Sequence, residues 1–168
     1  MGHALLAVVL ALAGVNELYH IDTALTERVQ AQARSYGLEY RVVVAVAPAW
    51  RARGIVDTRT RVRDNIVAII VSPILLEEMD REALEGMFAH ELAHPQRACG
   101  LGQYATLADE IACEHPADVQ AAKWVGRRAV LRGLCQLRAI SWDWRYSTDA
   151  TGTNERIKRL HERTDISE

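Results

Sequence analysis

Cysteine is scarce in this sequence: its 168 residues include only Cys99, Cys113 and Cys135. Three cysteines cannot build the disulfide framework that holds many small secreted domains together. No two of them form a C-x-x-C pair, so a zinc site made of thiolates is not expected either. We expect reduced, mostly buried thiols and a cytoplasmic protein.

The chain also lacks a strong charge of either sign. It has 20 Lys and Arg against 22 Asp and Glu, which gives a net charge of −2. Because no global field attracts nucleic acid, we expect no nucleic-acid partner. A chain of this length with 49% hydrophobic residues has the size and composition of one compact globular domain.

Long hydrophobic runs are absent as well. The run from Ala4 to Val15 falls short of the roughly 20 apolar residues that a membrane span needs. No Lys or Arg precedes it, unlike in a typical signal peptide. We favour a buried helix within residues 1–20, followed by one domain over 21–168. A membrane or export signal is the alternative, and it would make the protein membrane-associated.

Hydrophobic periodicity and capping residues predict an α+β fold with a small sheet. Its first helix, over residues 21–36, has Asp22 or Thr23 as N-cap and Gly37 as its stop. Strands are predicted over 40–46 and 66–71, and further helices over 83–94, 106–125, 127–138 and 154–163. Asp80 is the expected N-cap of the helix over 83–94.

Arginines gather between the two predicted strands, at Arg51, Arg53, Arg59, Arg61 and Arg63. We interpret this stretch as a solvated loop or a polar hairpin at the edge of the sheet. A second interpretation gives it a role in holding an acidic substrate.

The segment His90-Glu91-Leu92-Ala93-His94 is an H-E-x-x-H motif on a predicted helix. Four residues make slightly more than one turn, so both imidazoles lie on one face and can hold one ion. Glu91 lies beside them, where its carboxylate can accept a proton from metal-bound water. Zinc suits such ligands because it leaves a fourth position open for that water. We expect one Zn²⁺ per chain.

A second pair of acidic residues completes the expected site. Glu114 follows His94 after an interval long enough for a turn and an antiparallel helix. Asp118 lies about one helical turn further on, on the same face. We expect Glu114 to be the third ligand. Asp118 is expected to accept the second ring N–H of His90 or His94, which fixes the tautomer of that ring.

Glu110 and His115 are the alternatives to Glu114. Glu110 lies one turn earlier on the same face, where it could be the ligand or a further partner of the histidines. His115 points about 100° away from Glu114 on an ideal helix, which disfavours it as a co-ligand.

Two prolines fall close to the predicted ligands. Pro95 lacks a backbone donor, so the helix of the motif should end at His94. Pro116 should bend the following helix between Glu114 and Asp118 for the same reason.

At these residues the sequence resembles the gluzincin metallopeptidases, most closely the HtpX-like and CAAX-prenyl-protease-like family. Leu76 to His94 looks like that family's active-site helix, and the segment from Glu114 matches its E-x-x-A-D signature. Thr153 to Leu160 is similar to its C-terminal R-I-x-x-L helix. The resemblance implies a zincin-like domain in which Glu114 is the ligand and Asp118 orients a histidine. The short chain is closest to the minigluzincin members.

A neighbouring gluzincin family, the ImmA/IrrE-like regulatory peptidases, has similar spacing and is the rival interpretation. The first family's Ser/Thr-His-Pro before its final helix is absent here, where Ser147-Thr148-Asp149-Ala150 stands instead. Because the histidine of that motif is missing, the resemblance assigns no residue of this chain to stabilise the oxyanion. By chemistry alone, the candidate donors are Tyr104, Tyr146, Arg156 and His161.

The resemblance implies a zinc-dependent endopeptidase, with Glu91 as general base towards a metal-activated water. Its partner would be a peptide or protein substrate bound in extended form, as an added strand on the exposed edge of the strand over 66–71. The alternative is a non-catalytic interaction module that zinc stabilises.

Overall fold

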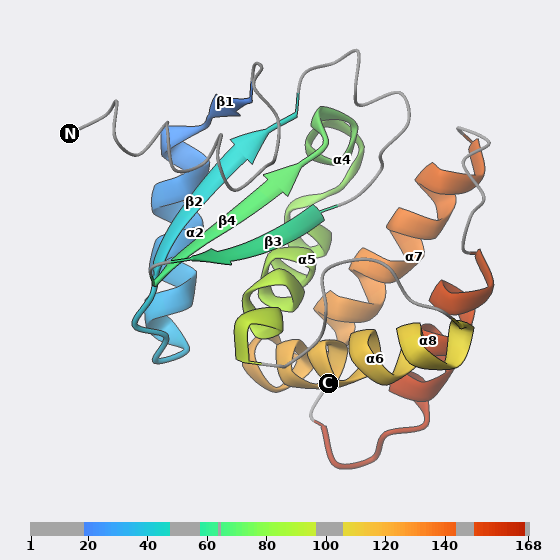
Figure 1. Cartoon of the computed structure of the whole chain (residues 1–168). Helices are drawn as coiled ribbons and strands as arrows, with labels where there is room; N and C mark the ends of the chain where they lie inside the picture. The colour runs from blue at the N-terminus through green and yellow to red at the C-terminus, as the bar shows by residue number, and fades with distance from the viewer. Residues whose placement is uncertain (1–18, 48–57, 64, 97–105, 144–149, 167–168) are drawn as a thin grey trace.

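The computed structural model describes residues 19–47, 58–63, 65–96, 106–143 and 150–166. The strands are β1 (His20–Ile21), β2 (Arg41–Val46), β3 (Thr58–Arg63) and β4 (Ile66–Val71). The helices are α2 (Thr23–Ser35), α4 (Pro73–Glu78), α5 (Arg81–Ala93), α6 (Leu107–Val125), α7 (Arg127–Asp143) and α8 (Ala150–His161). A 3₁₀ turn, His94–Gln96, follows α5. The fold is α+β, as predicted, with the strands on one side of the molecule and α6, α7 and α8 on the other (Figure 1).

The four strands form one mixed sheet in the order β1-β2-β4-β3. β2 and β4 are parallel, whereas β3 runs antiparallel to β4 and β1 antiparallel to β2. The β-branched runs of β2 and β4 occupy the centre, where both faces are covered and alternation of polar residues is not required. The prediction that β4 has an exposed edge is therefore wrong, because β2 and β3 pair with it on both sides. The edge strand next to it is β3.

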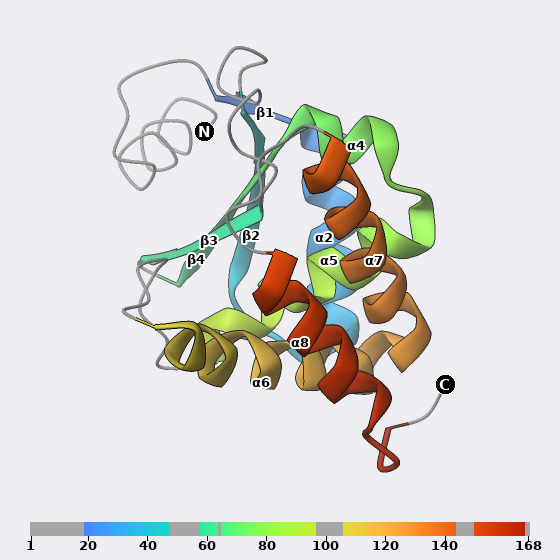
Figure 2. The ribbon, with the colours of Figure 1, turned by 90° about the vertical axis from the view of Figure 1, so that its right-hand side faces the viewer.

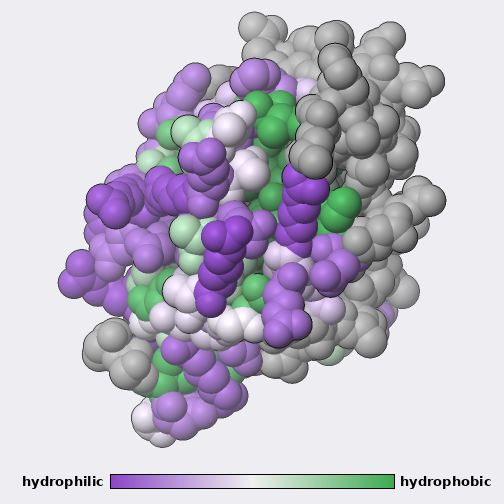
Figure 3. Space-filling view, turned by 90° about the vertical axis from the view of Figure 1, so that its left-hand side faces the viewer, coloured by the Kyte–Doolittle hydropathy of each residue, from purple (hydrophilic) through white to green (hydrophobic). Residues whose placement is uncertain are grey.

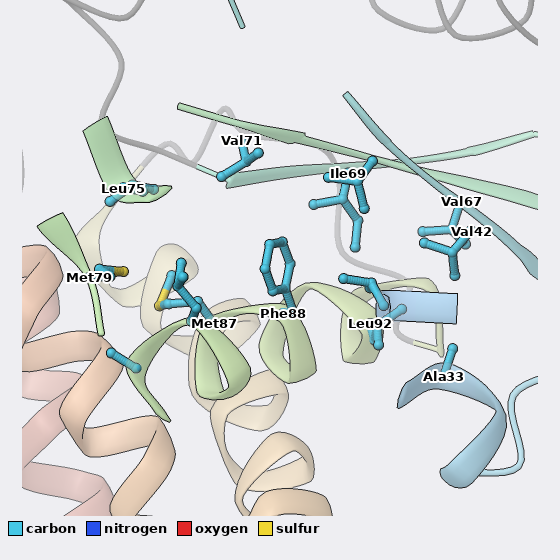
Figure 4. Close-up of a cluster of buried hydrophobic side chains, with 14 of the residues drawn as sticks. Ala33, Val42, Val67, Ile69, Val71, Leu75, Met79, Met87, Phe88 and Leu92 are labelled. Atoms are coloured by element: carbon cyan, nitrogen blue, oxygen red, sulfur yellow. The ribbon is translucent and has the colours of Figure 1, made fainter. Parts of the chain in front are cut away.

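The main core lies between this sheet and α5. Phe88, Met87 and Leu92 of α5 lie against Val67, Ile69 and Val71 of β4 (Figure 4). Phe88 and Leu92 are four residues apart, so they lie on one face of the helix and reach the sheet together. α2 covers the neighbouring part of the same core, and the side of the molecule that carries α2 shows mostly hydrophilic side chains (Figure 3).

α5 is buried almost all round, because α6 and α7 pack on the side away from the sheet (Figure 2). Its contact with α7 is close: a Cβ on Gly86 would lie 2.3 Å from the backbone oxygen of Ala129. Glycine is therefore required at this crossing, four residues before His90. The tight packing fixes the position of the helix that carries the H-E-x-x-H motif.

Most of the predicted elements are confirmed with small shifts at their ends. The predicted caps of α2 and α5 are correct, since Asp22 accepts from the backbone N–H of Leu25 and Asp80 from that of Ala83. The sequence pattern missed β1 and α4, and it ended α7 too early. Residues 58–63 of the arginine-rich stretch form a strand at an edge of the sheet, as the hairpin interpretation expected.

The expectation of reduced cysteines is wrong for Cys113, which is disulfide-bonded, whereas Cys135 is a free thiol. Spacing along the chain cannot reveal such a pairing, because the fold decides which sulfurs meet. The remaining cysteine, Cys99, lies outside the described residues, as do residues 1–18, so the prediction for the N-terminal apolar run stays a prediction. Across the described parts of the chain, no helix combines the length and apolar character needed to cross a membrane.

Candidate metal centre

The two histidines of the motif meet at the C-terminal end of α5. Asp80 caps this helix at its start, and α5 ends at Ala93, with His94 as C-cap before the 3₁₀ turn. Pro95 thus ends the helix where predicted. The Nε2 atoms of His90 and His94 lie 3.0 Å apart, and the ring planes make an angle of 88°. The two ring nitrogens therefore lie at one place.

α6 brings Glu114 to the same place. Its Oε2 atom lies 3.0 Å from Nε2 of His90 and 3.7 Å from Nε2 of His94. The separation along the sequence is bridged because α6 packs directly against α5. The structure therefore brings together all three residues that the sequence predicts as ligands.

Asp118 lies behind His90. Its Oδ1 atom is 2.8 Å from Nδ1 of His90, and its side chain is 1% exposed. A carboxylate can only accept, so Nδ1 of His90 carries the proton of this contact and Nε2 faces Glu114 and His94. Pro116 lies inside α6 without separating these contacts. Whether or not Pro116 bends α6, it does not keep Asp118 from His90.

The sequence did not reveal that Arg156 lies beside Asp118 and Glu114. Arg156 comes from α8, is 7% exposed, and binds both oxygens of Asp118 through Nε and Nη2, each at 2.8 Å. Its Nη1 atom lies 3.3 Å from Oε2 of Glu114. The sequence pointed to Arg156 only as one of several donors for an oxyanion. The R-I-x-x-L pattern was a signal that this position matters, but not that its partner is Asp118.

The carboxylates and the arginine set the charge of the centre. Burial alone would lower the pKa of His90, but Asp118 and Glu114 outweigh it and raise that pKa. Burial would raise the pKa of Asp118, yet the Arg156 guanidinium and His90 lower it to about 2. Burial acts in the same way on Glu114, and its contacts with the two histidines and Arg156 hold its pKa well below the ordinary range. Both carboxylates are therefore charged at neutral pH, although both lie in the interior.

His90, Glu91 and His94 form a group that could hold a metal ion, with ligand atoms all within 4.8 Å of one another. The Glu91 side chain is buried, at 4% exposure, among the ligand candidates. The Oε2 atom of Glu114 lies 3.0 Å from Nε2 of His90 and 3.7 Å from Nε2 of His94, and both distances are shorter than 4.8 Å. Two carboxylates thus flank the histidines, one from the motif helix and one from α6.

The other candidates are not part of this cluster. The Nδ1 atom of His115 is buried without a hydrogen-bond partner among the described residues, and it is not in the metal-binding group. His161 is exposed at the end of α8. The side chain of Glu110, and Tyr104 and Tyr146 entirely, lie outside what the structure describes.

Comparison of the chain with family models, with curated proteins and with solved structures gives no match to any of them. The functional argument therefore rests on the residues and their geometry.

Proposed function

We propose that this protein is a zinc-dependent endopeptidase with a zincin-like domain. His90, His94 and Glu114 would hold one Zn²⁺, and Glu91 would act as general base. The observation that carries the proposal is the convergence of two imidazole nitrogens and one carboxylate oxygen, at 3.0, 3.0 and 3.7 Å from one another. The resemblance of the motifs to the HtpX-like and CAAX-prenyl-protease-like gluzincins supports the same activity.

The donor set fits zinc. Tetrahedral zinc with bonds of about 2.0–2.2 Å places neighbouring ligand atoms about 3.3 Å apart, close to the three separations between His90, His94 and Glu114. Two imidazoles and a carboxylate leave one position for water or substrate, as in catalytic zinc sites. The hydrogen bond from His90 to Asp118 matches the carboxylate–histidine pairs that orient zinc ligands.

In a bound state zinc would acidify a water molecule and polarise the scissile carbonyl. The chain's own residues do the rest. The Glu91 carboxylate accepts the proton of the attacking water and delivers it to the leaving amine. Asp118 keeps the proton of His90 on Nδ1, so that the lone pair of Nε2 stays available to bind the metal.

Arg156 supports this arrangement through the carboxylates. Its fork binds Asp118 with two parallel hydrogen bonds and so fixes the plane of that carboxylate. It also balances part of the negative charge that Glu91, Glu114 and Asp118 place in the interior. Arg156 is thus a positioning residue in this proposal, not the oxyanion donor.

A structural zinc site is the alternative that the burial of Glu91 favours. Structural sites are closed by four protein ligands, and Glu91 could serve as the fourth. In that case zinc would stabilise the fold, and no peptide bond would be hydrolysed.

The test combines zinc content with hydrolysis of quenched peptides. We expect about one zinc per chain in the wild type, a loss of zinc in Glu114→Ala and His94→Ala, and retained zinc in Glu91→Gln. Loss of the general base should lower kcat by about 10²–10⁴-fold. Glu85→Gln, an exposed change on the same helix, and Glu162→Ala are matched controls that should keep both properties.

Two results would contradict the proposal in different ways. Zinc bound by the same residues without hydrolysis of any peptide would assign the centre to the structural alternative. A wild type that takes up no zinc after dialysis against the metal would remove the metal centre itself.

A further inference from the structure

The last turn of α5 carries the candidate metal centre at a point where a helix runs out of its own hydrogen bonds. The final carbonyl groups of any α-helix have no N–H partner four residues further on within that helix. In α5 this turn holds His90 and Glu91, and His94 follows as the C-cap. Pro95 comes next and has no N–H to donate. The positions of these side chains therefore depend on what else holds the end of the helix.

Tyr40 reaches this turn from outside the helix. Its hydroxyl donates a hydrogen bond to the backbone oxygen of Leu92, at 2.5 Å, although Leu92 lies 52 residues further along the chain. Leu92 is the residue that separates Glu91 from Ala93 on the last turn. Because Leu92 is 0% exposed, water does not reach its carbonyl, and a donor from the protein is needed there.

The hydroxyl of Tyr40 is a dependable donor. Burial raises the pKa of Tyr40 well above its ordinary value, so the phenol keeps its proton at neutral pH. A backbone carbonyl oxygen can only accept, which fixes the direction of the hydrogen bond to Leu92.

Tyr40 is itself held firmly just before β2. Its ring packs against the main core. The side-chain amide of Gln30, on α2, donates to the backbone oxygen of Tyr40 at 3.2 Å and accepts from the N–H of Val42 at 2.8 Å. Gln30 thus fixes the backbone on both sides of Arg41, the first residue of β2. The start of β2 is therefore a fixed base from which the phenol reaches the end of α5.

We propose that Tyr40 is a positioning residue of the metal centre, which holds the last turn of α5 so that His90 and His94 stay together. The inference rests on the proposed zinc site and deepens it. Helix ends fray, and a frayed last turn would separate the Nε2 atoms of the two histidines, which lie 3.0 Å apart. Without the hydroxyl, zinc must order this turn when it binds, and the lost conformational entropy lowers its affinity.

The test compares Tyr40→Phe with Tyr36→Phe in the full-length protein. Each change removes one hydroxyl from a partly buried ring that packs against the main core. The Tyr36 hydroxyl accepts from Gln32 on α2, at 2.7 Å, and so belongs to a different part of the molecule from the last turn of α5. Tyr36→Phe is therefore a matched control for the loss of a phenol hydroxyl.

Hydrogen exchange of the zinc-free protein measures the fraying directly. The backbone N–H groups of residues 90–93 should exchange up to about tenfold faster in Tyr40→Phe, because one hydrogen bond no longer opposes local opening. The same groups should exchange at the wild-type rate in Tyr36→Phe.

Zinc affinity, measured by competition with a chelator, tests the consequence for the centre. Loss of a partner that orients metal ligands typically weakens metal binding 10–100-fold, and we expect about tenfold for Tyr40→Phe because it acts through the backbone. Tyr36→Phe should bind zinc as the wild type does. Urea denaturation should show similar losses of stability in both variants. That split separates positioning from a merely structural role, which would lower stability and leave the zinc affinity of the folded protein unchanged.

Equal zinc affinity of Tyr40→Phe and the wild type would overturn the inference, even if the last turn exchanges faster. Equal losses of affinity in Tyr40→Phe and Tyr36→Phe would overturn it as well. Both outcomes leave the proposed function standing, because the wild type still binds zinc in them. A wild type that binds no zinc would remove the proposed metal centre, and this inference with it.

Discussion

The guanidinium of Arg156 and the carboxylate of Asp118 form a two-point ion pair, with both N–O distances at 2.8 Å, in the interior of the protein. The pair joins α8, the last helix, to α6, which carries Glu114. It stands directly behind His90, so the C-terminal helix is part of the framework of the metal centre. This link carries our first prediction.

Replacement of Arg156 by methionine should destabilise the protein strongly. The change keeps much of the side-chain volume but leaves the buried Asp118 carboxylate with only its contact to His90, and breaking a buried ion pair costs roughly 3–5 kcal/mol. Urea denaturation measures this loss in the free energy of unfolding. Arg156→Lys should lose less, because it keeps the charge but not the two-point geometry.

The control for this prediction is Arg159→Met on the same helix. Arg159 is 46% exposed and pairs with Glu155 on the surface, so its loss should change stability by about 0.5 kcal/mol or less. Equal effects of the Arg156 and Arg159 changes would show that the buried pair adds nothing beyond an exposed one.

Gly86→Ala should weaken the contact between α5 and α7. The added methyl would lie 2.3 Å from the carbonyl oxygen of Ala129, a backbone atom that cannot move aside without shifting its helix. Overpacking of this kind typically costs about 1–3 kcal/mol, despite the better helix propensity of alanine. Chemical denaturation is the measurement. Glu85→Ala, at the exposed neighbouring position, should be nearly neutral, and a stable Gly86→Ala protein would refute the close approach.

Asp80 should make stability depend on pH at the acidic end. Its cap of α5 and its contacts with Gln136 and Arg132 lower its pKa from 3.8 to about 2. A lowered pKa in the folded state means that the stabilisation is present above about pH 4. It is lost as the pH falls through 2. Asp80→Asn keeps a capping side chain but removes the charge.

The difference in unfolding free energy between wild type and Asp80→Asn should therefore be largest near neutral pH. It should shrink steadily between about pH 4 and pH 2, as denaturation at a series of pH values would show. A difference that stays constant over this range would mean that the Asp80 charge does not stabilise the helix.

The disulfide of Cys113 predicts which thiols react. Cys113 is disulfide-bonded, whereas Cys135 is a free thiol. Alkylation in denaturant without reductant should therefore modify Cys135 but not Cys113, and alkylation after reduction should modify both. Mass spectrometry of the digested protein is the measurement. Alkylation of Cys113 in the unreduced protein would contradict the disulfide.

Much of the candidate centre was predictable because its ligands obey helical geometry. His90 and His94 share a face of one helix, and so do Glu114 and Asp118. Spacing of this kind is local and survives folding. The partner of Asp118 was not predictable, because Arg156 lies 38 residues further along the chain and on a different helix. No periodicity connects positions that only packing brings together.

The sheet shows the same division. The apolar, β-branched runs predicted β2 and β4, since such residues pack well on a strand buried on both faces. Which strand forms the edge could not be read from those runs. The arginine-rich segment was open to a loop or hairpin interpretation, and its pairing with β4 decides that β3 is the edge strand.

The sequence by itself therefore determined the helices other than α4, the two central strands and His90, Glu91, His94 and Glu114 as candidate residues of a metal centre, because period, capping and residue type act over a few residues. Only the tertiary structure decided that Arg156 binds Asp118 behind the centre, that Cys113 is disulfide-bonded and that β3 pairs with β4 at an edge of the sheet. These relationships depend on contacts between distant segments. Such contacts form because apolar burial brings α5, α6 and the sheet together, and not because of any local signal.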